Sequence, residues 1–247
     1  MDKSKSLPSL VEMLSAGMHF GHRSSRWHPK MKQYIHSIRN GVHIIDLDKT
    51  VAHLEKALDF IRDTVAAGGT ILIVGTKEQA QAVTDRIGKE CGMPYVHRRW
   101  LGGTLTNFKM LKDNLLGRYL DLKDRQSRGE LSKYTKKEQL EFAKKIEELD
   151  AKVGSFANLV KLPEVVFILD PKTEATAFAE AIETKVPIVA VCDTNVNPEM
   201  VSYPIPANDD AVKSIELIMN LVAEAVKEGK KLAAERPIVP AAPMSNV

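Results

Sequence analysis

The chain has 247 residues, of which 44% are hydrophobic and 27% charged, and it carries a formal net charge of +3 and two cysteines. This length suffices for one large domain, or for a smaller domain with an insertion. No apolar run reaches the roughly 20 residues of a membrane span, and residues 1–10 lack the apolar core of a signal peptide, so we expect neither a membrane protein nor a secreted one. Cys91 and Cys192 lack Cys-x-x-Cys spacing, which excludes a disulfide scaffold and a cysteine-based zinc ribbon.

Short apolar runs alternate with segments of helical period along most of the chain. The three longest runs, at 71–74, 165–169 and 188–191, are continuous and rich in β-branched residues, which is typical of parallel strands covered on both faces. Repeated β-α units of this kind predict an α/β fold with a doubly wound parallel sheet in three layers. The predicted strands are 42–46, 70–75, 95–97, 165–170 and 188–193, and the predicted helices are 51–65, 80–87, 173–184 and 209–228.

Residues 105–159 interrupt this rhythm, because they contain no strand-like run and are dense in Lys, Arg, Glu and Leu. Gly129 marks a turn between two predicted helices, and Thr135 with Glu138 fits a capping box at the start of the second. Two stripes at helical spacing support the pair: Leu105, Phe108, Leu111 or Lys112, Leu115, Tyr119 and Leu122, then Leu140, Ala143, Ile146, Leu149, Val153 and Phe156. We expect a protruding, coiled-coil-like antiparallel hairpin, with a helical pair folded flat over the sheet edge as the alternative.

The predicted organisation therefore has three parts. An α/β domain comprises residues 1–104 and 160–230 and includes a basic N-terminal segment, and the helical hairpin of residues 105–159 is inserted into it. Residues 231–247 contain three prolines and form a tail that we expect to be disordered.

Positive charge is concentrated in two of four segments. Residues 1–39 carry a net charge of +5 and residues 97–137 carry +7, whereas residues 40–96 carry −2 and residues 138–247 carry −7. Two basic blocks on an otherwise acidic chain predict local patches that suit a phosphate-backbone partner.

Within both basic blocks, cations alternate with planar rings and small polar residues. Arginine and lysine neutralise phosphates, while a tryptophan or histidine ring can stack on a ribose or an unstacked base. Trp100 is expected to pack mainly inside, with stacking on RNA as the alternative. The predicted RNA-binding residues are His19, His22, Arg23, Arg26, Trp27, Lys30 and Lys32 in the first block, and Arg98, Arg99, Thr104, Thr106, Asn107 and Lys109 in the second.

The sequence offers little support for catalysis. It contains no Walker loop, no Gly-x-Gly-x-x-Gly, no Gly-x-Ser-x-Gly and no His-Glu-x-x-His. The turn at Val74–Lys77 could hold a phosphate at a helix N-terminus, but such a turn is also an ordinary strand-to-helix connection. His19 and His22 are three residues apart, and Asp193, Asp209 and Asp210 follow predicted strands, so a carboxylate and imidazole metal site is considered, with His19, Asp193 and Asp209 as its first candidates. Histidines beside arginines more often contact phosphate or water. We expect no catalytic residue, no cofactor and no bound metal.

Six motifs in order along the chain resemble the bacterial ribosomal protein S two family of the small subunit. They are residues 14–22, 27–31, 75–77, 99–107, 193–195 and 205–211. The resemblance implies a flavodoxin-like sheet with a protruding hairpin, a structural role in translation on the cytoplasmic ribosome, and no catalysis. The implied partners are 16S ribosomal RNA and other small-subunit proteins, including the mRNA-binding ribosomal protein S one, and no membrane. The sequence does not distinguish a bacterial from a plastid source.

Two other classes of protein fit the composition. A nucleotide- or phosphate-binding α/β enzyme would need a phosphate loop with a catalytic constellation, and a free-standing RNA-binding regulator would explain the basic blocks equally well.

Overall fold

The computed structural model describes residues 7–235, and its centre is a five-stranded parallel sheet in the order β5-β4-β6-β7-β8. The first strand in chain order, β4, is followed by the edge strand β5 on one side and then by β6, β7 and β8 on the other side. This is the strand order of flavodoxin-type doubly wound sheets. Every residue of β4, β6 and β7 is buried, which explains why their sequences are continuous apolar runs. The strands are β4 (Ile71–Val74), β5 (Tyr95–Val96), β6 (Val165–Ile168), β7 (Ile188–Cys192) and β8 (Tyr203–Pro206).

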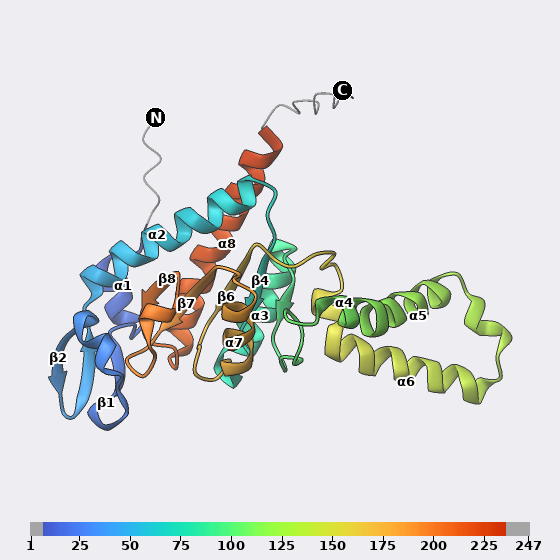
Figure 1. Ribbon diagram of the computed structural model, residues 1–247, viewed down its shortest axis with the longest axis horizontal. Coiled ribbons are helices and arrows are strands. Elements are labelled where there is room, and N and C mark those ends of the chain that lie inside the picture. Colours follow the sequence, from blue (N-terminus) through green and yellow to red (C-terminus); the bar gives the residue numbers. More distant parts are fainter. Residues whose placement is uncertain (1–6, 236–247) are drawn as a thin grey trace.

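Helices cover both faces of this sheet and produce the three predicted layers (Figure 1). One face packs against α2 (Leu47–Ala66), α3 (Glu78–Cys91) and α8 (Val212–Glu235), and the other against α7 (Ala175–Glu183). Successive strand residues serve opposite faces: Ile71 and Ile73 belong to the first cluster, whereas Leu72 and Val74 belong to the second.

A second, antiparallel sheet lies outside the parallel one, in the order β1-β3-β2. Its strands are β1 (Phe20–Arg23), β2 (Ile35–Arg39) and β3 (Val42–Ile45), and Asn40 and Gly41 turn between the last two with φ of 50° and 75°. Positive φ at both positions is the pattern of a type I′ hairpin turn.

The structure corrects the prediction that residues 42–46 form a strand of the parallel sheet. The fifth parallel strand is β8, which the sequence analysis missed because Pro204 and Pro206 interrupt it. Proline cannot donate to a sheet ladder, but β8 is an edge strand and tolerates the loss.

The inserted segment contains α4 (Phe108–Leu111), a π-helical turn (Lys112–Leu116), α5 (Gly117–Ser127) and α6 (Lys136–Val153). The capping box of Thr135 and Glu138 is confirmed, and Gly129 adopts φ of 72° in the connection. Figure 1 shows α5 and α6 extending from the body at the end opposite to β1 and β2. The predicted second stripe is wrong at its start, because Leu140 and Ala143 are exposed and Phe142 instead packs 5.1 Å from the ring of Tyr134.

The remaining helical turns are α1 (Leu10–Ser15) and five 3-10 turns: Ser24–Arg26, Pro29–Tyr34, Glu130–Lys133, Gly154–Phe156 and Pro198–Met200. Residues 231–235 belong to α8, so the predicted disordered tail begins too early, and its remainder, 236–247, lies outside the described residues. No helix within residues 7–235 combines the length and the apolar composition needed to cross a bilayer.

Candidate nucleic-acid interface

Hydrogen bonds connect residues 20–28 of the first basic block to the carboxyl edge of the parallel sheet. The backbone N–H of His22 donates to Thr194 Oγ1 at 2.9 Å, and that of His28 donates to the Thr194 carbonyl at 2.7 Å. Asn208 donates its side-chain N–H to the carbonyl of Phe20. A Cβ at Gly21 would lie 2.5 Å from Cγ2 of Thr194, so only glycine allows this close approach. The motifs at 193–195 and 205–211 thus hold the block in place.

Four of the predicted cations in this block face solvent: Arg23, Arg26, Lys30 and Lys32. Lys30 pairs with Glu199 at 2.8 Å, and both side chains are more than half exposed, so solvent weakens that pair. The other three form no ion pair with an acidic residue in the described part of the chain. They are therefore available to a phosphate.

The rings of the first block are less accessible than its cations. Trp27 is half-buried and lies 5.2 Å from the ring of His43, while His19 is half-buried with its ring 3.9 Å from that of Phe20. Burial lowers the pKa of His19. His22 turns toward acidic residues of the sheet edge rather than outward.

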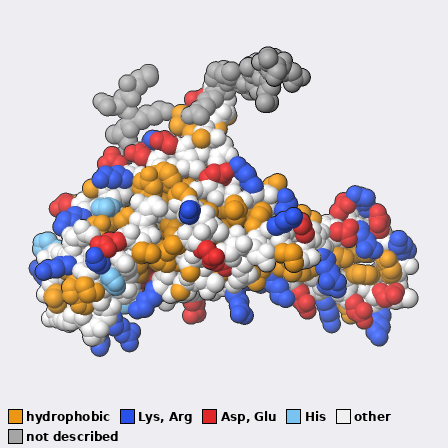
Figure 2. Space-filling view, viewed as in Figure 1, with side chains coloured by type: hydrophobic (Ala, Val, Ile, Leu, Met, Phe, Trp, Pro, Cys, Tyr) orange, Lys and Arg blue, Asp and Glu red, His pale blue; other side chains and the backbone are white. Residues whose placement is uncertain are grey.

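The predicted RNA-binding residues of the second basic block lie in the loop between β5 and α4 and in the first turn of α4, and some of their neighbours are buried. Arg98, Arg99, Asn107 and Lys109 are exposed, whereas Trp100 is 9% exposed, which confirms the prediction that it packs inside. Figure 2 shows Lys and Arg side chains along the lower margin of the body and at the end that carries β1 and β2, and mixed with acids on the hairpin.

Two predicted phosphate donors in this loop are engaged within the protein. Thr104 is fully buried, and its hydroxyl donates to the carbonyl of Leu101 at 2.6 Å. The hydroxyl and the backbone N–H of Thr106 both donate to Glu180 of α7, a residue that the sequence analysis did not single out. In this conformation Thr104 and Thr106 shape the loop and do not present donors to an RNA.

The polar groups of the turn at Val74–Lys77, which was considered as a phosphate site, also bind partners within the protein. The backbone N–H of Thr76 donates to Glu174 Oε1 at 2.6 Å. The ammonium of Lys77 lies 3.2 Å from Asp170, 2.8 Å from Asp209 and 2.6 Å from Asp210. Burial alone would lower the pKa of Lys77, but these carboxylates raise it above its usual value. A nucleotide phosphate at this turn would have to displace two sets of charged contacts.

A carboxylate and imidazole cluster lies beside Lys77. His22 Nδ1 is 3.0 Å from Asp193, and one ligand atom from each of His22, Asp193, Asp209 and Asp210 lies within 4.8 Å of the others. Oδ2 of Asp209 is buried and finds no hydrogen-bond donor in residues 7–235. Such a donor set could hold a divalent cation. The structure brings His22, Asp193, Asp209 and Asp210 of the candidate set together, whereas His19 is not a member of this cluster.

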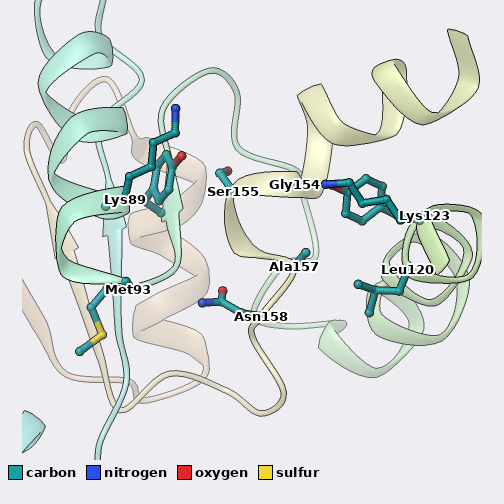
Figure 3. A pocket seen from close by; sticks show the side chains of 12 residues that line it. Lys89, Met93, Leu120, Lys123, Gly154, Ser155, Ala157 and Asn158 are labelled. Carbon is teal, nitrogen blue, oxygen red and sulfur yellow. The ribbon is translucent and has the colours of Figure 1, made fainter. Parts of the chain in front are cut away.

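An open pocket of about 460 Å³ lies at the base of the hairpin, and no sequence motif signals it (Figure 3). Met93 and Leu120 give it apolar walls, and Lys89, Lys123 and Asn158 contribute polar groups. Tyr119 also lines it, and its hydroxyl donates to Asp150 of α6. The pocket therefore marks the junction at which the hairpin leaves the body.

Fold and surface together define a class: an α/β protein with exposed cations in two blocks and no catalytic constellation among the residues that the structure describes. Comparisons with known proteins narrow this class to one family. The profile of Ribosomal protein S2 matches residues 13–229. The chain belongs to the ribosomal protein S2 family, so it is a ribosomal protein and not an enzyme.

Individual relatives agree with this assignment. The chain is 46% identical over 222 residues to the small ribosomal subunit protein uS2 of Dehalococcoides mccartyi, covering 90% of each chain. It is 48% identical over 225 residues to the protein of that name from a Roseiflexus species, covering 91% of this chain and 85% of the relative. The uS2 of Desulfatibacillum aliphaticivorans is 46% identical over 228 residues, with 92% and 77% coverage.

Proposed function

We propose that the protein is a structural constituent of the small ribosomal subunit and that it binds 16S ribosomal RNA through two basic surfaces. The first basic surface consists of Arg23, Arg26, Lys30 and Lys32, and the second consists of Arg98, Arg99, Asn107 and Lys109. The observation that carries the proposal is that the cations of both surfaces are exposed while the loops beneath them are held by buried and part-buried hydrogen bonds. When a loop is already fixed, binding of its cations to phosphates orders the side chains but need not order the backbone.

Rings contribute less to this interface than the sequence analysis predicted. The half-buried Trp27 is proposed to stack on the RNA, and the half-buried His19 to contact it at the margin of the first basic surface. His22, Thr104 and Thr106 act from beneath the two surfaces.

The hairpin is proposed as a coiled-coil-like arm that contacts neighbouring components of the particle. Tyr119 and Lys123 of α5 bind Asp150 of α6, and Ile146 and Leu149 are buried within the pair. On the body, the side chains of Leu10, Val11, Leu14 and Phe20 are exposed and offer apolar surface to a protein neighbour. Partners of the arm and of this surface are other small-subunit proteins, and the family resemblance adds the mRNA-binding ribosomal protein S one on the cytoplasmic ribosome.

Sedimentation tests the assignment to the particle. The full chain should sediment with small subunits from a cell lysate. Recovery only in the free pool or on other RNAs would favour a free-standing regulator, and specific retention of a nucleotide in equilibrium dialysis would favour the nucleotide-binding alternative.

Salt dependence tests the two surfaces. If they neutralise about six phosphates, the logarithm of the affinity for 16S RNA should fall with the logarithm of salt concentration with a slope of roughly −4 to −5. Replacing Arg98 and Arg99 by alanine should flatten that slope by about one to two units. The matched control replaces Lys213 and Lys231, two exposed residues of α8, by alanine and should leave the slope unchanged. Equal flattening by both pairs would contradict local surfaces.

A further inference from the structure

Five hydrogen bonds from a single loop converge on one buried carboxylate. Glu180 of α7 is 7% exposed, and its Oε1 accepts from Trp100 Nε1 at 3.1 Å and from the N–H of Gly103 at 2.8 Å. Its Oε2 accepts from the N–H of Leu105 at 2.9 Å, and from the N–H and hydroxyl of Thr106 at 3.3 and 3.4 Å. Both oxygens therefore accept hydrogen bonds from one stretch of seven residues, 74 to 80 positions away in the sequence.

The donors are all neutral, which makes this arrangement different from an ion pair. Glu180 forms no salt bridge with a cation in residues 7–235, and three of its donors are backbone N–H groups. Backbone N–H groups that converge in a turn create an anion-binding concavity. Here the anion is built into the protein. The backbone N–H groups of Gly103, Leu105 and Thr106 are therefore not free for an RNA phosphate, and we expect the contacts to come from the side chains around the loop.

The loop depends on this carboxylate for its shape. Residues 101–107 form no helix or strand, and Gly103 adopts φ of 86°. Apart from Glu180, the loop is held by short-range bonds such as Thr104 to Leu101 at 2.6 Å and Asn107 N–H to the Gly103 carbonyl at 2.9 Å. Trp100 and Leu105 enter the hydrophobic cluster at the two ends of the loop, and Glu180 ties both of them to α7.

We propose that Glu180 is the positioning residue of the second basic surface. By holding Trp100, Gly103 and Leu105 inward, it fixes the direction in which the adjoining Arg98, Arg99 and Asn107 leave the loop. Glu180 itself touches no RNA, and it acts through these side chains on the phosphates. The inference rests on the RNA-binding function proposed above.

Glu180→Gln is the direct test, because glutamine keeps the shape of the side chain but replaces one acceptor oxygen with a donor. That donor would face the N–H groups of either Trp100 and Gly103 or Leu105 and Thr106, and the loop must rearrange. Affinity for a 16S RNA transcript should fall about tenfold, the effect of misplacing one or two charge-assisted contacts. The matched control is Glu183→Gln, an exposed residue on the same helix with the same change of charge, and it should stay within about twofold of wild type.

A double-mutant cycle separates positioning from a general loss of structure. Combining Glu180→Gln with Arg98→Ala, Arg99→Ala and Asn107→Ala should weaken binding no further than those three substitutions alone, because the same contacts are already lost. Amide exchange of Gly103, Leu105 and Thr106 should accelerate in Glu180→Gln, while amides of β4 and β6 keep their protection. Additive effects on affinity would overturn the inference.

The possible outcomes distinguish this inference from the proposed function. A wild-type chain that does not bind the transcript would refute RNA binding itself. If wild type binds, the arginine variant is weak and Glu180→Gln matches Glu183→Gln, then RNA binding stands and positioning by Glu180 is wrong. Should Glu180→Gln not fold, Trp100→Phe removes a single donor and should lower affinity about two- to threefold in a folded chain, and an unchanged affinity would overturn the inference.

Discussion

The two basic surfaces are anchored in different ways. Beneath the first, hydrogen bonds are spread over several elements, including Thr194 after β7 and Asn208 after β8. Beneath the second, one side chain of α7, Glu180, accepts all five bonds from the loop. A distributed anchor keeps most of its contacts when one is lost, whereas a concentrated anchor loses its geometry. A single substitution in the anchor should therefore disturb the second basic surface more than the first.

The surfaces also differ in what they pack upon. Trp100 and Leu105 share a hydrophobic cluster with Leu116, Tyr119 and Phe156 at the base of the hairpin. The first surface lies beside the small antiparallel sheet, at the other end of the molecule from the hairpin (Figure 1). Substitutions at the hairpin base should consequently alter the conformation of the second basic surface and leave that of the first unchanged.

The largest effect is expected from removing the hairpin at two different depths. Replacing residues 121–148 with a short Gly/Ser linker removes Leu122, Leu131 and Ile146, which we expect to be buried within the arm itself, but keeps Tyr119, Leu149 and Phe156 at its base. The melting temperature of the body should then change by less than about 3 °C. Replacing residues 105–159 removes several buried side chains, each worth about 2 to 5 kcal/mol, and should lower the melting temperature by more than about 10 °C. Equal melting temperatures for the two deletions would show that the hairpin base is not part of the core.

Trp100→Ala should have the next largest effect, about 3 to 5 kcal/mol of unfolding free energy measured by denaturant titration. The substitution empties a buried site and removes one of the five donors to Glu180. Trp27→Ala, at a half-buried ring in the first block, should cost less. If Trp100→Ala leaves stability unchanged but abolishes RNA binding, the indole is a stacking group and the burial argument fails.

A pair of glycine substitutions tests how closely each loop approaches the body. Gly21→Ala places a Cβ 2.5 Å from Cγ2 of Thr194 and 3.2 Å from the carbonyl of His43, and should cost about 1 to 3 kcal/mol. A Cβ at Gly102 meets nothing within 4 Å, so Gly102→Ala should change the unfolding free energy by less than about 0.5 kcal/mol. A costlier Gly102→Ala would mean that the second loop, and not the first, is tightly apposed.

Local sequence pattern predicts some of these features and not others. Continuous apolar runs identified β4, β6 and β7, and spacing identified the helical pair and its capping box, because each pattern reports burial or capping within a few residues. The strand β8 was missed because two prolines in four residues read as a loop. The local signal for the antiparallel sheet is the Asn40–Gly41 pair, which favours the positive φ of a tight hairpin turn.

Long-range pairing accounts for most of what the sequence did not reveal about the site. Glu180 reads as an ordinary helix residue, since its partners lie 74 to 80 positions earlier. His22 and His19 cannot be told apart from the sequence, and it is the contact of β1 with Thr194, through the N–H of His22, that places the His22 ring beside Asp193. Which surface residues stay exposed was predictable for the arginines and lysines, because a charge without a partner remains in water.

The smallest expected effect concerns pH and again contrasts Glu180 with Glu183. Burial alone would raise the pKa of Glu180, but hydrogen bonds from Leu105, Trp100, Gly103 and Thr106 lower it below the ordinary 4.5. A depressed pKa in the folded state contributes stability that is complete above the unfolded value and is lost as the pH falls through the folded one.

The difference in unfolding free energy between wild type and Glu180→Gln should therefore be largest near neutral pH and should shrink as the pH falls below about 4.5. Glu183→Gln, on the exposed face of the same helix, should show little such dependence. Urea titrations of the three chains at neutral and acid pH measure this directly. A gap between wild type and Glu180→Gln that stays constant as the pH falls would mean that the five hydrogen bonds do not depend on the charge of the carboxylate, and the anchor of the second surface would then be geometric rather than electrostatic.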